Sequence, residues 1–218
     1  NRPPLRPNPL TPLPVGNIEP EGWLLKQLEL EANGMVGQLG KVSGYLEKQN
    51  NAWLSPEGKG ENGWEEVPYW LRGFSALGYI LENERIMEET REWIEPIIAS
   101  QREDGYFGPR SNLKENGHHD MMPNMFMMFA LRSYYEYTKD QRIIDLLTEY
   151  FKWQLEIPDD KFFSGGWQSP RNGDNLVSVY WLYKRTGDKF LSELAEKLQR
   201  TGASWMNAPS LEHREHNV

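Results

Sequence analysis

The pattern of apolar and polar positions repeats three times along the chain, each time as a pair of helices. Each copy has an aromatic-rich helix, a tight turn that contains Asn or Asp, and an amphipathic helix with a stripe of Ile or Leu. The copies span residues 76–94, 131–151 and 179–198, with turns at Glu82-Asn83, Lys139-Asp140 and Gly187-Asp188. Helical hairpins that recur at about 50-residue intervals predict an all-α fold.

Long links rich in Gly, Trp, Tyr, Asp and His separate the hairpins, at residues 101–120 and 157–175. An open solenoid has a shorter and stricter period of roughly 34 to 47 residues. A closed ring of hairpins tolerates long links, because the links build a cleft at one end of the ring. We therefore predict an (α/α)6 toroid. Three hairpins and one leading helix would supply only the N-terminal half of such a catalytic domain.

The start of the chain predicts an extended arm. Residues 1–18 hold six prolines, which lack the N–H group that helices and central strands need. We expect Leu5, Leu10 and Leu13 to pin this arm on the body. A helix that has proline and acids in its first turn should follow, so residues 19–218 are assigned to the catalytic-domain part.

Composition narrows the choice of partners. The net charge of −8 argues against nucleic acid and against an anionic membrane surface. No apolar run is long enough to span a bilayer, and the mean hydropathy is −0.73. The chain has no cysteine, which excludes a thiolate zinc site or a cysteine nucleophile within these residues. An aromatic content of 12% suits a carbohydrate-active protein, and equally an aromatic-cored helical domain.

The entrance to the first hairpin combines flat aromatic faces with carboxylates. Trp64, Tyr69 and Trp70 are suited to stack on the apolar C–H faces of a sugar. Glu65 and Glu66 are suited to accept hydrogen bonds from its hydroxyl groups. The alternative is an ordinary helix start, with its aromatics in the core and its glutamates favoured by the helix dipole.

The first link offers an aromatic residue and an imidazole. An Asp-Gly turn presents Tyr106, and His119 lies at a helix N-terminus, where imidazole stays neutral and can bond to hydroxyl groups. Asp120 is a candidate N-cap. A turn with an aromatic plug and a surface histidine is the alternative. The methionines that follow are expected to fill the core: Met121, Met122, Met125, Met127 and Met128.

The second link places stacking and hydrogen-bonding groups together. Trp167 lies beside two glycines, and Asn172, Asp174 and Asn175 follow at the entrance to a helix. Helix capping by Asp174 is the alternative, but this combination is more than capping requires. His216 comes three residues after another histidine near the end of the sequence, which is too little to define a metal site.

Four segments in this order resemble the beta-L-arabinofuranosidase-like glycoside hydrolases of family 127. The segments are Leu13-Pro-Val-Gly-Asn-Ile-Glu-Pro-Glu-Gly-Trp-Leu24, Gly63-Trp-Glu-Glu-Val-Pro-Tyr-Trp-Leu71, Gln101-Arg-Glu-Asp-Gly-Tyr-Phe-Gly108 and Gly173-Asp-Asn-Leu-Val-Ser-Val-Tyr-Trp-Leu-Tyr-Lys-Arg-Thr-Gly-Asp188. The resemblance covers nearly the whole chain. It implies an (α/α)6 barrel, followed by β-sandwich material that these residues do not include.

The resemblance also implies retaining hydrolysis of an unusual plant-wall sugar, such as an L-arabinofuranoside or an acid of a pectic side chain. The best-known branch of the family holds a cysteine nucleophile on zinc, through residues that would lie beyond Val218. No cofactor is evident within this chain. Where that branch often has His-Glu-Leu-Tyr-Cys-Ala-Gly-His, this sequence keeps the first histidine as His119 and has Phe126 in place of the second. A further histidine, of a His-Pro-Glu type, falls at Asn172.

We therefore expect a glycosidase that binds an oligosaccharide in the periplasm or outside the cell, with a cytoplasmic location left open. The acids to test as catalytic groups are Glu66, Asp120 and Asp174. One alternative is an unsaturated-uronide hydrolase on the same toroid. Another is a non-catalytic helical-repeat binding protein, which would have an extended concave surface and no single deep pocket.

Overall fold

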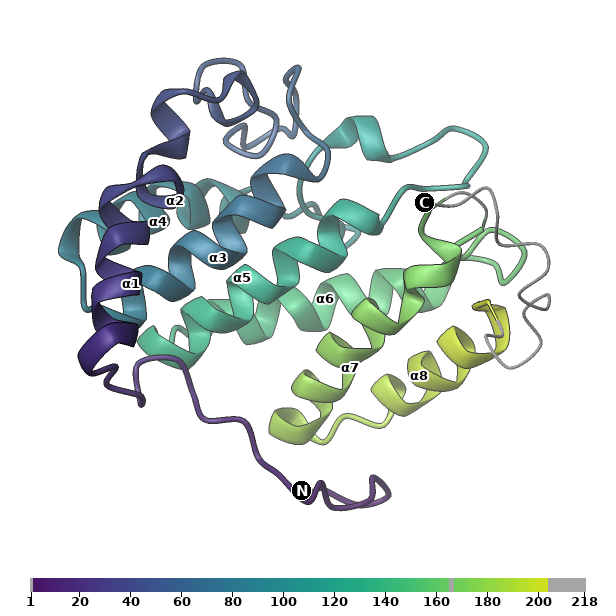
Figure 1. Cartoon of the computed structure of the whole chain (residues 1–218). Coiled ribbons are helices and arrows are strands. Elements are labelled where there is room, and N and C mark those ends of the chain that lie inside the picture. The colour runs from purple at the N-terminus through teal and green to yellow at the C-terminus, as the bar shows by residue number, and fades with distance from the viewer. Residues whose placement is uncertain (1, 165–166, 204–218) are drawn as a thin grey trace, which may run out of the picture.

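The computed structural model describes residues 2–164 and 167–203 (Figure 1). The α-helices are α1 (Gly22–Asn33), α2 (Met35–Gln38), α3 (Glu66–Ile80), α4 (Glu84–Ala99), α5 (Met122–Thr138), α6 (Arg142–Glu156), α7 (Asn172–Thr186) and α8 (Phe190–Thr201). Short 3-10 turns lie at Leu39–Lys41, Gly44–Leu46, Arg110–Asn112 and Ser169–Arg171. These ranges contain no β-strand, and the predicted all-α fold is confirmed.

The three predicted hairpins are α3–α4, α5–α6 and α7–α8, and each turns where the sequence indicated. The Asn83 side chain accepts a hydrogen bond of 3.1 Å from the backbone N–H of Ile86 and so caps the start of α4. Lys139 and Gly187 adopt left-handed conformations, with φ of 61° and 80°, directly after α5 and α7. Such a residue ends a helix because it turns the backbone away from the helix axis.

The helices form two layers, as in an α/α toroid. Helices α3, α5 and α7 run side by side through the middle of Figure 1, and neighbours in this row contact each other. The second helix of each hairpin joins the other layer, in which α4 contacts α6 and α6 contacts α8. The link from α4 to α5 and the link from α6 to α7 therefore lie at the same end of the molecule.

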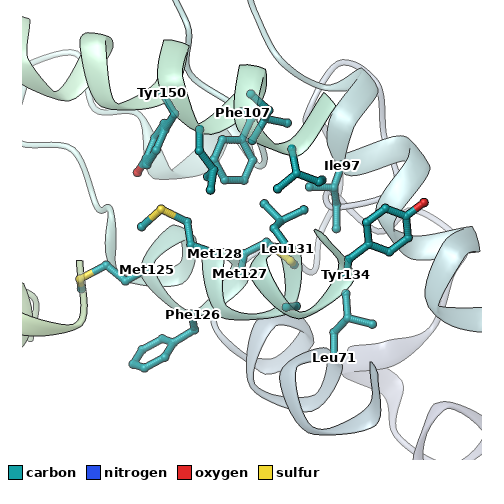
Figure 2. Packing of buried hydrophobic residues seen from close by; sticks show 14 of the residues in the cluster. Leu71, Ile97, Phe107, Met125, Phe126, Met127, Met128, Leu131, Tyr134 and Tyr150 are labelled. Atoms are coloured by element: carbon teal, nitrogen blue, oxygen red, sulfur yellow. The ribbon is translucent and has the colours of Figure 1, made fainter. Parts of the chain in front are cut away.

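Helix α5 lies at the centre of the hydrophobic core (Figure 2). The five methionines at its start are all buried, as predicted, and Leu131 and Tyr134 continue the buried set toward its end. Phe107 from the preceding link and Tyr150 from α6 pack on the same core. A helix that is apolar all round is stable in water only when other elements enclose it.

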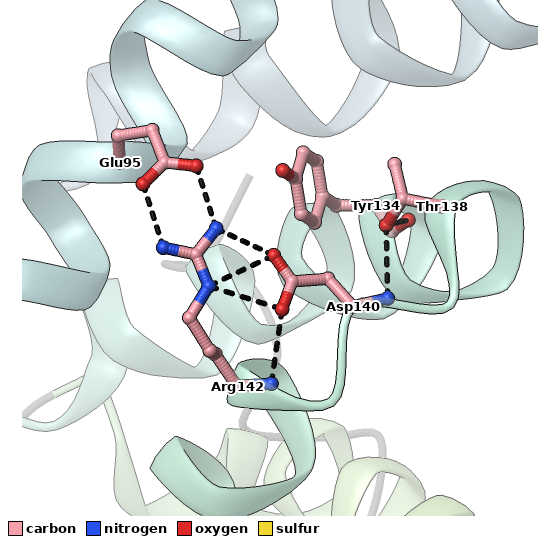
Figure 3. Close-up of polar contacts among 5 residues, drawn as sticks. All are labelled: Glu95, Tyr134, Thr138, Asp140 and Arg142. Carbon is pink, nitrogen blue, oxygen red and sulfur yellow. Dashed lines mark hydrogen bonds and ion pairs between the residues drawn. The ribbon is translucent and has the colours of Figure 1, made fainter.

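An arginine beside the turn of the second hairpin joins that hairpin to the first (Figure 3). Arg142, at the start of α6, donates two hydrogen bonds of 2.8 and 2.7 Å to the carboxylate of Glu95 on α4. It also bonds to Asp140 in the turn before α6. The hydrogen bonds from Arg142 lower the pKa of both carboxyl groups. This bidentate geometry fixes how the first and second hairpins meet.

The proline-rich arm crosses the end of α7. The Arg2 guanidinium donates to two backbone carbonyls at that end, and the Tyr183 hydroxyl donates to a carbonyl of the arm at 2.6 Å. Leu5 packs against the core as expected. The same expectation is wrong for Leu10 and Leu13, which are 83% and 65% exposed, because polar contacts near the start of the arm attach it instead. The division of the chain at residue 18 stays a prediction.

The end of α6 is closed by a lysine from α8. The Lys197 side chain is only 5% exposed. Its ammonium group donates to the carbonyls of Gln154 at 3.3 Å, Leu155 at 2.7 Å and Ile157. These carbonyls belong to the last turn of α6, where intrahelical donors run out. A cation at this end also favours the helix dipole, so Lys197 joins α8 to α6.

The Lys197→Met variant should lower the free energy of unfolding by about 1–3 kcal/mol, because it keeps the apolar stem and leaves buried carbonyls without a donor. Chemical denaturation followed by circular dichroism measures the change. Lys152→Met on α6, where the side chain is 54% exposed, is the control and should change the stability by less than about 0.5 kcal/mol. Equal effects from the two variants would contradict the capping role.

Candidate functional site

The candidate site lies at the N-terminal ends of α3, α5 and α7, which share one end of the molecule (Figure 1). The described parts of the preceding loops, residues 50–65, 100–121, 157–164 and 167–171, gather there. The exposed N–H groups at these helix starts favour negative charge and hydrogen-bond acceptors nearby. The site is therefore built mainly from loop residues held against three parallel helices.

A hydrogen bond joins the first two loops. The indole Nε1 of Trp64 donates to Oδ2 of Asp120 at 2.9 Å. The other carboxylate oxygen of Asp120 accepts from the backbone N–H of Met122, the first residue of α5, at 3.1 Å. The N-cap position of α5 is Met121, so the N-cap role predicted for Asp120 is corrected. The Trp64 ring is 38% exposed. Asp120 therefore orients an accessible aromatic face, and both of its oxygens are occupied by protein donors.

Gln168 ties the third loop to the same point. Its side-chain oxygen accepts from the backbone N–H of Met121 at 3.0 Å, and its amide nitrogen donates to the carbonyl of His119 at 2.8 Å. The Gln168 side chain is buried. The sequence did not single out this residue, because its two partners lie almost fifty positions earlier in the chain. Gln168 fixes the loop that carries Trp167 next to the start of α5.

The His119 ring is oriented by two contacts. Its Nδ1 accepts from the backbone N–H of Lys114 at 3.0 Å, and its ring stacks on Trp153 with centroids 5.5 Å apart. Burial lowers the pKa of His119, and the charge of Lys161 lowers it further. The imidazole is thus neutral at neutral pH and carries its proton on Nε2, which is the tautomer that donates to a hydroxyl.

Tyr69 and Glu65 lie together beside α5. The Tyr69 ring is 44% exposed and stacks on Phe126 at 4.2 Å between centroids. Burial raises the pKa of the Glu65 carboxyl, and repulsion from Glu66 and then Asp120 raises it further, while Arg171 opposes the rise. Burial likewise raises the pKa of the Tyr69 hydroxyl, and the charge of Glu65 adds to the effect. These groups therefore share one electrostatic environment.

An arginine and an indole form the far side of the site. The Arg171 guanidinium lies 5.2 Å from the centroid of the Trp167 ring and donates to the Trp167 carbonyl at 2.9 Å. Trp167 is 65% exposed. The charge of Arg171 opposes the rise in the pKa of both Glu65 and Tyr69, so this loop and α3 influence each other electrostatically. The sequence predicted Trp167 but not the role of Arg171.

The remaining predicted residues at the start of α7 divide into two kinds. Asp174 is half-buried in the first turn of α7, and its charge contributes to the raised pKa of Tyr69. It does not cap the helix, since the N-cap position is Arg171 and has no side-chain cap. The Asn172 side-chain amide donates a hydrogen bond to the carbonyl of Leu198 on α8 at 2.7 Å, so this nitrogen already has a partner within the protein.

We call the connected group of exposed and half-buried residues the aromatic–carboxylate surface. Its members are Trp64, Glu65, Glu66, Tyr69, Asp120, Trp167, Arg171 and Asp174. It contains both aromatic faces and oxygen acceptors. This chemistry suits a sugar ring, whose C–H faces are apolar and whose rim carries hydroxyl groups.

Two predicted stacking residues belong to the core instead. Trp70 is 8% exposed, stacks on Phe74 and donates its indole N–H to the carbonyl of Val36 at 3.1 Å. Tyr106 is fully buried, and its hydroxyl donates to the carbonyl of Pro109 at 2.7 Å. Neither ring can face a ligand while the core is closed, so the binding role expected of both is corrected to packing.

Asn175 is also corrected from a binding residue to a core residue. It is fully buried, and it exchanges two hydrogen bonds with the amide of Gln154 on α6, at 3.1 and 2.8 Å. This reciprocal pair satisfies both amides away from water and joins the two helix layers. His216 lies outside the described residues.

Residues 2–164 and 167–203 contain no cluster of three or more His, Cys, Asp or Glu residues that could hold a metal ion. Together with the absence of cysteine from the sequence, this arrangement does not fit a cysteine–zinc centre built from these residues. No helix among them is long and apolar enough to cross a membrane.

Comparison with known families decides the identity. Residues 38–218 match the family model described as beta-L-arabinofuranosidase, GH127 catalytic domain. The chain belongs to this family. It is therefore a glycosidase, and its substrate is a carbohydrate. No curated protein and no solved structure matches the chain.

The match places every member of the aromatic–carboxylate surface within the GH127 catalytic domain, because it begins before α3 and continues beyond α7. The resemblance read from the sequence is thereby confirmed. The roles of individual residues are a separate matter and stay predictions, since the family match does not assign them.

The Asn175→Ala variant should destabilise the protein by about 1–3 kcal/mol, because it leaves the buried amide of Gln154 without a partner. Thermal and urea unfolding measure this loss. Asp174→Ala, one position earlier and half-buried, should have a much smaller effect on stability. A stable Asn175→Ala protein with weakened sugar binding would restore the original assignment.

The raised pKa of Glu65 predicts a pH-dependent stability. A carboxyl whose folded-state pKa lies above its ordinary value of 4.5 disfavours the folded state once it ionises. Glu65→Gln should therefore raise Tm relative to the wild type at about pH 7. The gain should disappear at about pH 3.5, where Glu65 is protonated in both states. Calorimetry at the two pH values, with the exposed Glu61→Gln as control, tests the sign.

Proposed function

We propose that the protein releases an L-arabinofuranose-like sugar from plant cell-wall glycans and binds it on the aromatic–carboxylate surface. The observation that carries the proposal is the Trp64–Asp120 hydrogen bond, which joins the loops before α3 and α5 into a single accessible surface of aromatic faces and acceptors. A plant-wall substrate would favour a location in the periplasm or outside the cell, and this location is part of the proposal.

The charge of the surface favours a neutral sugar over an acidic one. Its four carboxyl groups are Glu65, Glu66, Asp120 and Asp174, and Arg171 is its one cation. Repulsion among the acids already raises the pKa of Glu65. A uronate would add a further negative charge to this environment and bind at an electrostatic cost. A furanose without a carboxylate does not meet that penalty, so we favour the neutral substrate among the pectic side-chain sugars.

The geometry supports different roles for the acids. Both carboxylate oxygens of Asp120 accept hydrogen bonds from protein N–H groups, so we propose that Asp120 positions Trp64. Glu66 and Asp174 lie in the first turns of α3 and α7 and are half-buried. Those two are the carboxylates we propose to test first for contact with the sugar. Retaining hydrolysis uses two groups about 5 Å apart, and we assign no such pair here.

The deciding experiment is sugar release by the complete gene product, tested on a panel of L-arabinofuranosides, pectic oligosaccharides and unsaturated uronides. Each reaction is run with and without a zinc chelator. We expect release from the furanosides. Activity only on the unsaturated uronides would instead establish the alternative hydrolase. A folded protein that acts on none of the substrates would leave a binding role.

The chelator separates two mechanisms within a positive result. Loss of activity would indicate a metal-dependent nucleophile, which the described residues do not supply. Activity that is indifferent to the chelator would direct attention to Glu66 and Asp174. In that case Glu66→Gln or Asp174→Asn should lower kcat by about a hundredfold or more if the residue transfers a proton, while Asp120→Asn should act mainly on KM.

Tyr69 offers a matched pair of variants for the binding surface. Tyr69→Ala removes the ring that stacks on Phe126 and should raise KM roughly tenfold with kcat nearly unchanged. Tyr69→Phe keeps the ring and should stay close to the wild type. A fall in kcat at constant KM in Tyr69→Ala would contradict a stacking role.

A further inference from the structure

A cavity of about 870 Å³ lies between the proline-rich arm and the row of helices α3, α5 and α7. We call it the arm cavity. One wall consists of arm residues between positions 5 and 15, and the other of side chains from the three helices, among them Arg72, Phe129 and Trp181. None of the residues of the aromatic–carboxylate surface lines it. Its size is in the range of small-molecule sites, about 300–1,000 Å³.

The arm cavity is positively charged, although the whole chain has a net charge of −8. Five cationic side chains and one carboxylate line it: Arg6, Arg72, Arg132, Lys184, Arg185 and Glu136. A concave surface lined by one sign of charge concentrates ligands of the opposite sign. The contrast with the overall charge therefore points to an anionic ligand.

The one carboxylate in the cavity is already committed. Glu136 forms an ion pair with Arg185 and accepts a hydrogen bond of 2.8 Å from the indole of Trp181. It is also 3.8 Å from the ammonium of Lys139. Within residues 2–164 and 167–203, no carboxylate forms an ion pair with Arg72 or Arg132. These two charges lack a protein counter-ion there.

Arg132 is held in a low-dielectric position. Its guanidinium lies 5.1 Å from the centroid of Phe129 and 5.7 Å from that of Trp181. One terminal nitrogen donates to the hydroxyl of Ser178 at 3.2 Å, whereas the buried Nε–H has no partner among the described residues. Burial lowers the pKa of Arg132 to about 10, so the group stays charged at neutral pH. A desolvated cation is costly unless an anion compensates it.

Arg72 places a second cation at the same ring. Its guanidinium lies 4.8 Å from the centroid of Phe129, close to the separation of Arg132 from that ring. Guanidinium groups match the oxygen pairs of carboxylates and phosphates. Tyr180 and Val177 add apolar surface to the lining, which suits a ligand with a ring or a carbon body.

We propose that the arm cavity binds a small oxyanion, a carboxylate or a phosphate, through Arg72 and Arg132. The ligand compensates the charges of Arg72 and Arg132, neither of which forms an ion pair with a carboxylate among the described residues. This site shares no residue with the proposed sugar site and lies further along the same helices, although the charge of Arg72 reaches the Tyr69 hydroxyl. A negative result for anion binding would therefore not contradict the glycosidase proposal.

The test uses two probes, inorganic phosphate and D-galacturonate, with chloride at matched ionic strength as the reference. Thermal unfolding and titration calorimetry measure binding to the 218-residue chain. We expect a saturable rise in Tm with at least one probe, beyond that with chloride. A response to phosphate alone identifies a phosphorylated ligand, and one to galacturonate alone identifies a carboxylate.

Variants place the binding in the cavity. Arg72→Gln removes a cation from an exposed position, so the fold should persist and affinity should fall at least about tenfold. Arg132→Gln should also weaken binding, and Arg132→Lys should restore only part of it, since a point charge replaces the planar fork. Arg91→Gln on α4, outside the cavity, is the matched control and should bind as the wild type does.

Two results would overturn the proposal. One is that neither probe stabilises the wild type more than chloride does. The other is that Arg72→Gln and Arg91→Gln respond equally, which would mean that the anions bind the surface without selection. Circular dichroism of each free variant verifies that it is folded, and the Arg72→Gln comparison is decisive even if Arg132→Gln unfolds.

Discussion

The enclosure of α5 is the constraint on which the rest of the structure depends. Residues 122–128, in its first half, are all buried, so α3, α6 and α7 have to cover that half of the helix. His119 and Asp120 lie just before this helix, so the packing of the helix also sets their positions. Gln168 then fixes the third loop to the same backbone. Burial of one helix thus positions residues of the candidate site that the core itself does not contain.

Helix order and turn positions were predictable because they follow from local periodicity and from residues that favour turns. Whether an individual side chain faces the core or the surface was harder to predict. Tyr69 and Trp70 are adjacent aromatic residues about 100° apart around α3, and only one of them can face the core. Either choice suits the pattern. Asn175 has a polar side chain at a helix start, and only a distant partner, Gln154, shows that it is buried. The contacts of Gln168 are equally distant in sequence, which explains why no local signal revealed it.

In α3 and α7, charged side chains lie at the helix ends where the helix dipole favours them. Acids lie in the first turns of α3 and α7, and Lys184 and Arg185 lie in the last turn of α7. Each end therefore gains from interaction with the backbone dipoles. Helix α7 therefore presents negative charge at its start and positive charge at its end, so a single helix contributes to two environments of opposite sign.

The turns and the links differ greatly in length. Three residues separate the two helices of each hairpin, at 81–83, 139–141 and 187–189, whereas residues 100–121 form the link before α5. One residue more in such a turn would shift the packing register of a whole hairpin. A long surface link can change its length without that effect. One end of the molecule therefore constrains the length of its turns, whereas the links at the other end, which carry much of the candidate site, tolerate insertions.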